Sequence, residues 1–183
     1  FMHSGPNVSP EGLSPEEKRG IERGIQFRQT GSAYAQMQGT TPNTLGAALS
    51  MSPVALLAYI AEKFYRWSAP DSQPSMDDIL TNVLLYWFSK NITSSFWLYY
   101  NRMNGGDIFP ISAKRIEAPT AVSVGPHELH WPPRSKIEQE VNLQSFEVVS
   151  KGGHFLAMER PALLAEAIRK HFGQKEIIQS LSG

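Results

Sequence analysis

Two short apolar runs near the C-terminal end of the chain constrain its fold more than any other feature. The first covers residues 119–124 and the second covers residues 145–150. Both contain adjacent or alternating valines and are short enough for strands, and each is followed within two residues by glycine, which favours a tight loop. Two strands cannot form a parallel sheet that is buried on both faces, so these valines need neighbours that the chain does not supply.

Each predicted strand leads into a loop with an ionisable residue. Glu128 follows the first run in Gly125-Pro126-His127-Glu128, and His154 follows the second in Gly152-Gly153-His154-Phe155. An acid and then a histidine, each just past the C-terminal end of a strand, suit the last two members of an α/β-hydrolase triad. The nucleophile of such a triad lies earlier in the chain, and no earlier residue looks like it. We therefore expect the second half of an enzyme.

The region before these strands is predicted to be helical. Ser14-Pro15-Glu16-Glu17 forms a capping-box start for a helix that runs towards Thr30, with Ile21 and Ile25 on its buried face. The helix from Val54 to Trp67 is apolar around most of its surface and should be largely buried. The other predicted helices begin at Pro42 or span residues 76–88, 93–103, 133–141 and 161–172. Ser75 with Asp78 is expected to cap the helix of residues 76–88.

This pattern predicts three parts. Residues 1–13 form a linker from the core, residues 14–107 form a helical cap (lid) domain, and residues 108–183 form the C-terminal part of an α/β-hydrolase core. The expected fold class is therefore α/β, represented by the helical cap, the last two strands and the C-terminal helices.

Composition excludes several other kinds of protein. The 17 basic and 17 acidic residues balance, so charge gives no argument for binding to nucleic acid. There is no cysteine, which excludes thiolate metal sites, and His127, His130 and His171 lack metal-ligand spacing. No run approaches the ~18 apolar residues of a membrane span, which predicts a cytoplasmic protein and leaves open an N-terminal anchor outside this chain.

An ordered set of short motifs resembles the cap domain and the acid and histidine loops of microsomal-type epoxide hydrolases. The resemblance runs from about His3 to Phe172 and lacks the family's earlier half, with its oxyanion loop and nucleophile elbow. The matching pieces are Tyr34-Ala35-Gln36-Met37-Gln38, Thr41-Pro42-Asn43-Thr44, Ser52-Pro53-Val54-Ala55, Glu62-Lys63-Phe64, Leu80-Thr81-Asn82, Tyr86-Trp87, Ser94-Ser95, Tyr99, Pro126-His127-Glu128 and Gly152-Gly153-His154-Phe155.

The resemblance implies a reaction and a site. In this family two cap tyrosines bind the epoxide oxygen, an aspartate attacks carbon, and a histidine with an acid activates water. By position the tyrosines are Tyr34 and Tyr99, the acid is Glu128 and the base is His154. The implied partners are an N-terminal half with the nucleophilic aspartate and the oxyanion hole, and a small hydrophobic epoxide, with a homodimer as an option. The resemblance implies that neither a metal nor another cofactor is needed.

The chemistry agrees with this assignment. Opening an epoxide produces an alkoxide, which needs a donor as its charge develops, and tyrosine stays protonated at neutral pH. A carboxylate nucleophile leaves an ester, which water activated by His154 can cleave while Glu128 holds the histidine tautomer.

Several alternatives remain open at this point. Glu117 or Asp107 could replace Glu128 as the acid, and Tyr100 could replace Tyr99 if the register is off by one. A haloalkane dehalogenase would hold its halide with tryptophan N–H groups, for which Trp67, Trp87, Trp97 and Trp131 are available. A helical binding module that has lost catalysis is the third hypothesis.

Overall fold

The computed structural model describes residues 12–105 and 115–174, which divide into two compact units. The strand unit contains both strands, and the helical unit contains only helices. Among the described residues, the strand unit comprises 12–25, Trp67–Ser72 and 115–174, and the helical unit comprises Gln26–Arg66 and 73–105. The predicted boundary at residue 107 stays a prediction, because it lies outside the described residues, as does nearly all of the predicted linker.

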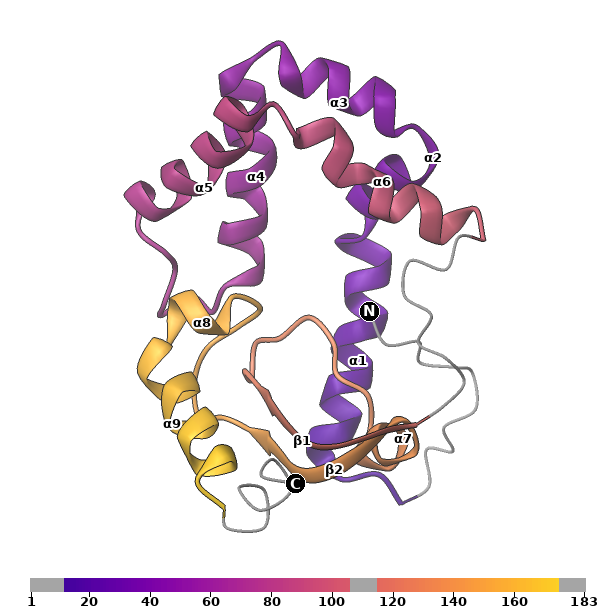
Figure 1. Ribbon diagram of the computed structural model, residues 1–183, viewed down its shortest axis with the longest axis vertical. Helices are drawn as coiled ribbons and strands as arrows, with labels where there is room; N and C mark the ends of the chain where they lie inside the picture. Colours follow the sequence, from indigo (N-terminus) through magenta and orange to yellow (C-terminus); the bar gives the residue numbers. More distant parts are fainter. Residues whose placement is uncertain (1–11, 106–114, 175–183) are drawn as a thin grey trace. The chain divides into compact units, whose positions relative to one another are not determined.

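The order of elements agrees with a helical region followed by a β-α-β-α segment (Figure 1). The elements are α1 (Pro15–Thr30), α2 (Ala33–Thr40), α3 (Pro42–Ser50), α4 (Pro53–Trp67), α5 (Met76–Ser89), α6 (Ile92–Met103), β1 (Ile116–Val124), α7 (Arg134–Glu140), β2 (Val141–Val148), α8 (Leu156–Glu159) and α9 (Pro161–Phe172).

The two strands pair in parallel, and α7 lies in the crossover between them (Figure 1). Val124 is opposite Val148, so both strands end at the same edge of the sheet. Each strand begins earlier than predicted. In β1 the register shifts between Ile116 and Pro119, because proline has no N–H to donate to the ladder.

The valines of the strands are only partly covered within this chain. Val149 is buried, whereas Val122, Val124 and Val148 are half-buried. This exposure agrees with the expectation that a two-stranded parallel sheet needs further neighbours.

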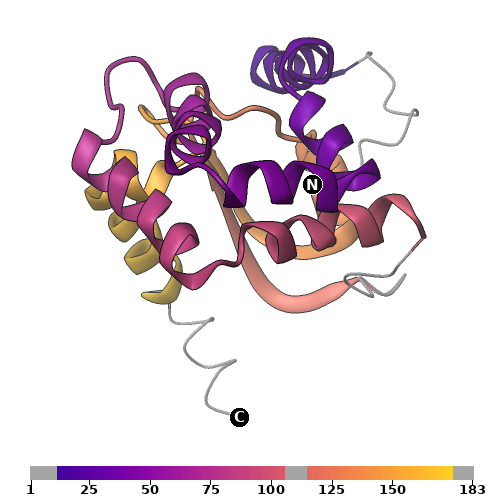
Figure 2. The ribbon, with the colours of Figure 1, turned by 90° about the horizontal axis from the view of Figure 1, so that it is seen from above.

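The helical unit is built around buried side chains from most of its helices. Ser75 and Asp78 form the predicted capping box at the start of α5, each side chain accepting from the other residue's backbone N–H. Helix α6 lies beside α2 and α3 (Figures 1 and 2). The buried hydrophobic residues of this unit are Tyr34, Leu49, Leu56, Ala61, Phe64, Ile79, Val83, Ile92 and Phe96.

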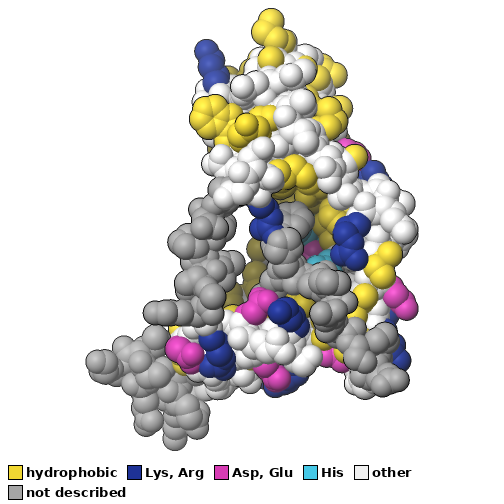
Figure 3. Space-filling view, turned by 90° about the vertical axis from the view of Figure 1, so that its right-hand side faces the viewer, with side chains coloured by type: hydrophobic (Ala, Val, Ile, Leu, Met, Phe, Trp, Pro, Cys, Tyr) yellow, Lys and Arg dark blue, Asp and Glu magenta, His cyan; other side chains and the backbone are white. Residues whose placement is uncertain are grey.

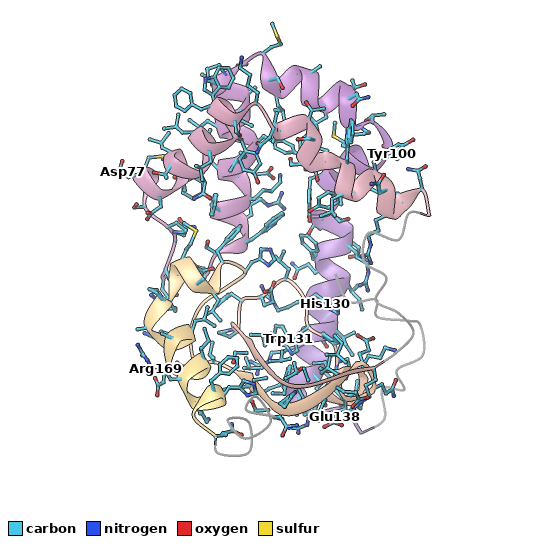
Figure 4. All side chains as sticks on the ribbon, viewed as in Figure 1. Asp77, Tyr100, His130, Trp131, Glu138 and Arg169 are labelled. Carbon is cyan, nitrogen blue, oxygen red and sulfur yellow. The ribbon has the colours of Figure 1, made fainter. Side chains whose placement is uncertain are left out.

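The predicted buried face of α1 is wrong. Ile25 is 44% exposed and Ile21 is half-buried, whereas Gly20 and Gly24 are the buried positions. A Cβ atom on Gly20 would lie 2.6 Å from Trp131 Nε1, and one on Gly24 would lie 2.6 Å from His130 Nδ1. The glycines therefore allow these two rings to pack against the helix (Figure 4). An apolar pattern could not reveal a face made of glycine.

The prediction that α4 is largely buried is also wrong. Leu56, Ala61 and Phe64 are buried, but Val54 is 72% exposed. Met51 and Phe88 are also exposed. Figure 3 shows apolar side chains at the surface of the helical unit.

Two short helices were not predicted. Helix α2 has eight residues and no side-chain hydrogen bond at its N-cap, and α8 has four residues. Such short helices depend on tertiary packing, so they leave little periodic signal in the sequence.

Within the described ranges, no single helix is long and apolar enough to cross a membrane. The pair α3 and α4 would pass that test together, but the two helices are bent by 118° at the break between them.

Candidate active site

The parallel pairing of β1 and β2 brings together the loops that follow the two strands. We call residues 125–128, after β1, the acid loop and residues 152–155, after β2, the histidine loop. The loops continue the strand pairing, since His127 N–H donates to the Gly152 carbonyl at 3.1 Å. A Cβ atom on Gly125 would collide with the Gly152 backbone, so a glycine is needed at this close approach. Adjacent parallel strands thus place the residues that follow them at one edge of the sheet.

Glu128 and His154 meet at this edge. His154 Nδ1 lies 2.7 Å from Glu128 Oε1, the distance of a strong hydrogen bond. The same carboxylate oxygen accepts from Leu129 N–H at 2.6 Å. The arrangement leaves His154 Nε2 as the ring nitrogen that can take a proton from another molecule. An imidazole held in this way can act as a general base.

The pKa of Glu128 lies below its ordinary value. Burial works to raise this pKa, but the hydrogen bond and charge of His154, the N–H of Leu129 and the charge of Arg23 together lower it. The carboxylate is therefore charged at neutral pH and can stabilise an imidazolium at His154.

Arg23 holds the acid loop in place through hydrogen bonds to its backbone, a role that the sequence pattern did not predict. Its Nε donates to the Glu128 carbonyl at 2.6 Å and its Nη2 donates to the His127 carbonyl at 2.8 Å. Burial lowers the pKa of Arg23, and the negative charge of Glu128 opposes this shift. The periodic pattern of α1 places Arg23 on the helix surface, and nothing local shows that a loop more than a hundred residues away meets it.

The two positions before His154 each need a glycine, for different structural reasons. Gly152 has a φ of +105°, a conformation that other residues rarely adopt. A Cβ atom on Gly153 would lie 2.6 Å from the Trp67 carbonyl and 2.7 Å from Ala69 N. The loop can therefore pack tightly against the segment Trp67–Ser72. The Trp67 ring meets the His154 ring edge-on, with centroids 5.4 Å apart.

The two candidate tyrosines meet each other in the helical unit. The rings of Tyr34, on α2, and Tyr99, on α6, make an edge-to-face contact with centroids 5.8 Å apart. Burial, together with the charge and hydrogen bond of Tyr99, raises the pKa of Tyr34, so its hydroxyl stays protonated. Tyr100, the next residue on α6 (labelled in Figure 4), is 43% exposed. The structure therefore pairs Tyr34 with Tyr99 and not with Tyr100.

The alternative residues are not brought together in the same way. Glu117 lies near the start of β1 and pairs with Arg115 at 2.7 Å, away from the strand ends. Asp107 lies outside the described residues. Trp131 is buried against Gly20, and the Trp97 Nε1 donates to Asn43 at 3.4 Å. The N–H of Trp97 is therefore already engaged by Asn43.

Within the described ranges no group of histidine and acidic side chains is arranged to hold a metal ion. The absence of a metal or cofactor from the reaction stays a prediction.

The lowered pKa of Glu128 predicts how stability depends on pH. A carboxyl group with a folded-state pKa below its unfolded value of 4.5 stabilises the fold above that value and loses this contribution as pH falls through the folded-state pKa. We expect Glu128→Gln to lower the melting temperature most at neutral pH. The difference from the original protein should shrink as the pH falls from 4.5 through the lower folded-state pKa, because Glu128 then also becomes neutral. Thermal unfolding followed by circular dichroism across this pH range measures it.

Glu117→Gln is the matched control, because it removes an exposed carboxylate whose surface ion pair contributes little to stability. A Glu128→Gln difference that stays constant from neutral to acidic pH would contradict the assignment.

Comparison with known proteins extends these observations. No protein-family model matches the chain. The chain is 38% identical over 179 residues to an epoxide hydrolase of Stigmatella aurantiaca, covering 92% of this chain and 40% of that protein. It is 37% identical over 157 residues to epoxide hydrolase 1 of Sus scrofa, covering 79% of this chain and 35% of the relative.

Solved structures give the same result. The structure of Aspergillus niger epoxide hydrolase matches with a TM-score of 0.82 and 35% identity, covering 95% of this chain and 44% of that one. Juvenile hormone epoxide hydrolase from Bombyx mori matches with a TM-score of 0.78 and 30% identity, over 93% and 43% of the respective chains. These relatives do not favour a dehalogenase or a non-catalytic module. By sequence and by structure, the chain belongs to the epoxide hydrolases of the α/β-hydrolase fold, and it spans about two fifths of the length of the relatives it matches.

Proposed function

We propose that this chain is the cap and C-terminal part of an enzyme that hydrolyses a small hydrophobic epoxide to a vicinal diol. The observation that carries the proposal is the 2.7 Å contact between His154 and Glu128, in a chain whose relatives are named epoxide hydrolases. The nucleophilic aspartate and the oxyanion hole belong to the N-terminal part, which the chain does not include.

In the first step the aspartate carboxylate attacks one epoxide carbon, and the bond between that carbon and the ring oxygen breaks. Tyr34 and Tyr99 donate to this oxygen as it becomes an alkoxide, and one of the two tyrosines transfers its proton to it, which gives the first hydroxyl of the diol. The raised pKa of Tyr34 keeps its hydroxyl in the donor form before the step. The product is an ester between the aspartate and the opened substrate.

In the second step His154 takes a proton from water, and the resulting hydroxide attacks the ester carbonyl. The ester bond breaks, the proton of the added hydroxide completes the second hydroxyl of the diol, and the aspartate is restored as a carboxylate. His154 then releases its proton, which replaces the proton that the tyrosine lost in the first step. Glu128 accepts from Nδ1–H of His154 and stabilises the imidazolium that forms. One epoxide and one water give one diol, and neither a metal nor a redox cofactor is needed in this scheme.

An isotope experiment tests the proposal. The chain is expressed together with the segment of the Aspergillus niger enzyme that it does not cover, and a small aryl epoxide such as styrene oxide is added in H₂¹⁸O. With enzyme in excess, the diol of the first turnover should carry the oxygen of the aspartate rather than ¹⁸O, because water attacks the ester carbonyl. Diol from many turnovers should carry one ¹⁸O.

The uncovered Aspergillus niger segment alone is the control and should give no diol. No diol from the combined protein would contradict the proposed activity, and ¹⁸O in the first-turnover diol would contradict the ester intermediate. Halide release from a haloalkane, measured in parallel, would instead favour a dehalogenase.

A further inference from the structure

Three features of the molecule lie outside the site described above and have no role in it. The first is the set of exposed apolar side chains of the helical unit, beside which no described residue indicates the kind of partner that would bind there. The pocket lined by Leu56, Tyr86, Trp87 and Phe88 has few polar groups that would select a ligand. The third is the buried carboxylate of Glu159, at the end of α8, which accepts hydrogen bonds from the residues on both sides of His154.

Glu159 is 6% exposed, and it accepts four hydrogen bonds. Oε2 accepts from Ala69 N–H at 2.8 Å, from the Ser72 hydroxyl at 2.9 Å and from Gly153 N–H at 2.8 Å. Oε1 accepts from Phe155 N–H at 2.9 Å. The ion pairs of the described residues include none with this carboxylate, so the four donors compensate its burial. All of these residues belong to the strand unit.

The contacts of Glu159 lie on both sides of His154. Gly153 N–H and Phe155 N–H, directly before and after the histidine, each donate to a different carboxylate oxygen. His154 N–H donates to the Trp67 carbonyl at 3.0 Å. Three successive backbone N–H groups are therefore held, two of them by one side chain.

The same carboxylate links the histidine loop to the segment Trp67–Ser72 through hydrogen bonds. Ala69 N–H and the Ser72 hydroxyl belong to this segment, whose Trp67 ring packs against the His154 ring. Arg160, the next residue after Glu159, adds an ion pair with Asp71 at 2.9 Å. The histidine is thus held from its backbone by Glu159 and from its ring by Glu128 and Trp67.

We propose that Glu159 is a positioning residue, which fixes the backbone on both sides of His154 so that its ring stays in line with Glu128 and with the attacking water. The proposal rests on the proposed function for its catalytic consequence, but the geometry it describes is independent of the substrate. A general base that moves by about 1 Å loses on the order of 100-fold in rate. Glu159 does not touch the substrate or the reacting atoms in this role.

The test compares the two chemical steps in the completed protein described above. In Glu159→Gln one acceptor oxygen is replaced by an NH₂ group, which cannot accept from the backbone N–H groups of the loop. We expect hydrolysis of the ester to slow by about 10- to 100-fold and epoxide opening to change by less than about twofold, because only hydrolysis needs the base. Single-turnover kinetics separate the two rates. A purely structural role would slow both steps.

Proton NMR supplies a readout without substrate. The proton shared by His154 Nδ1 and Glu128 should give a resonance far downfield, as expected for a short charge-assisted hydrogen bond. In Glu159→Gln this resonance should broaden or disappear while the dispersed amide spectrum remains. Glu166→Gln, at an exposed glutamate of α9, is the matched control and should keep both the resonance and the hydrolysis rate.

Ser72→Ala provides a milder variant if Glu159→Gln does not fold. It removes one of the four hydrogen bonds and keeps the carboxylate, and we expect the same selective effect on hydrolysis at about two- to fivefold. An unchanged resonance and hydrolysis rate in the variants would overturn the role of Glu159, as would an equal slowing of both steps. If the original protein opens no epoxide, the proposed function fails, and the NMR comparison still decides whether Glu159 positions His154.

Discussion

Replacing His154 with glutamine should trap the completed enzyme as a covalent ester after a single epoxide opening. The aspartate carboxylate attacks the epoxide without help from a base, whereas hydrolysis of the ester needs water activated by His154. We expect epoxide opening to change by less than about threefold and ester hydrolysis to slow by about 10²- to 10⁴-fold, the usual contribution of a general base. Glutamine has a similar size to histidine and cannot act as a base at this position.

Mass spectrometry of the intact protein mixed with substrate measures the result directly. The His154→Gln protein should gain the mass of one substrate molecule, and a protease digest should place this mass on the segment outside this chain. His127→Gln is the matched control, because His127 belongs to the acid loop and contacts the histidine loop through its backbone. It should turn over without accumulating an adduct. Normal steady-state turnover of His154→Gln, or the absence of an adduct, would contradict the role of His154.

Removing both tyrosine hydroxyls should almost abolish epoxide opening, while either single change leaves part of it. The developing alkoxide needs at least one donor, and Tyr34 and Tyr99 can each supply one. We expect each single Tyr→Phe change to slow opening by about 10- to 1000-fold, within the effect of losing one such donor. The losses should not add, because the remaining hydroxyl can still meet the oxygen. Pre-steady-state rates of ester formation in the original protein and the three variants measure this coupling.

Phenylalanine preserves the edge-to-face contact between Tyr34 and Tyr99, so the fold should remain intact. Tyr100→Phe, on the same helix at an exposed position, is the matched control and should open epoxides at the original rate. A double variant with near-normal rates would mean that the two tyrosines are core aromatics. A loss in Tyr100→Phe and not in Tyr99→Phe would shift the donor by one residue along α6.

Local patterns predicted those parts of the fold whose signals lie within a few residues. The capping box at Ser75 and Asp78 begins α5 as expected, and α9 has the predicted bounds from Pro161 to Phe172. The two valine-rich runs form adjacent parallel strands, so the placement of Glu128 and His154 just after them was enough to predict their meeting. Sequence could do this because the connection between parallel strands through a helix brings their C-terminal ends to the same edge.

Other features depend on contacts between distant residues, which a local pattern does not contain. The α1 face consists of Gly20 and Gly24, because the partners are the large rings of Trp131 and His130. Nothing around Arg23 indicates that it would donate to the backbone of the acid loop.

The amino-acid order alone therefore determined the helical region, the two strands, and the acid and histidine that follow them, because capping residues, apolar runs and glycines act over short distances. Only the tertiary structure decided that Arg23 holds the acid loop, that Tyr34 meets Tyr99 rather than Tyr100, and that Glu159 binds the backbone on both sides of His154. The physical reason is that a buried polar group needs hydrogen-bond partners, and folding supplies them from parts of the chain that are far apart in sequence.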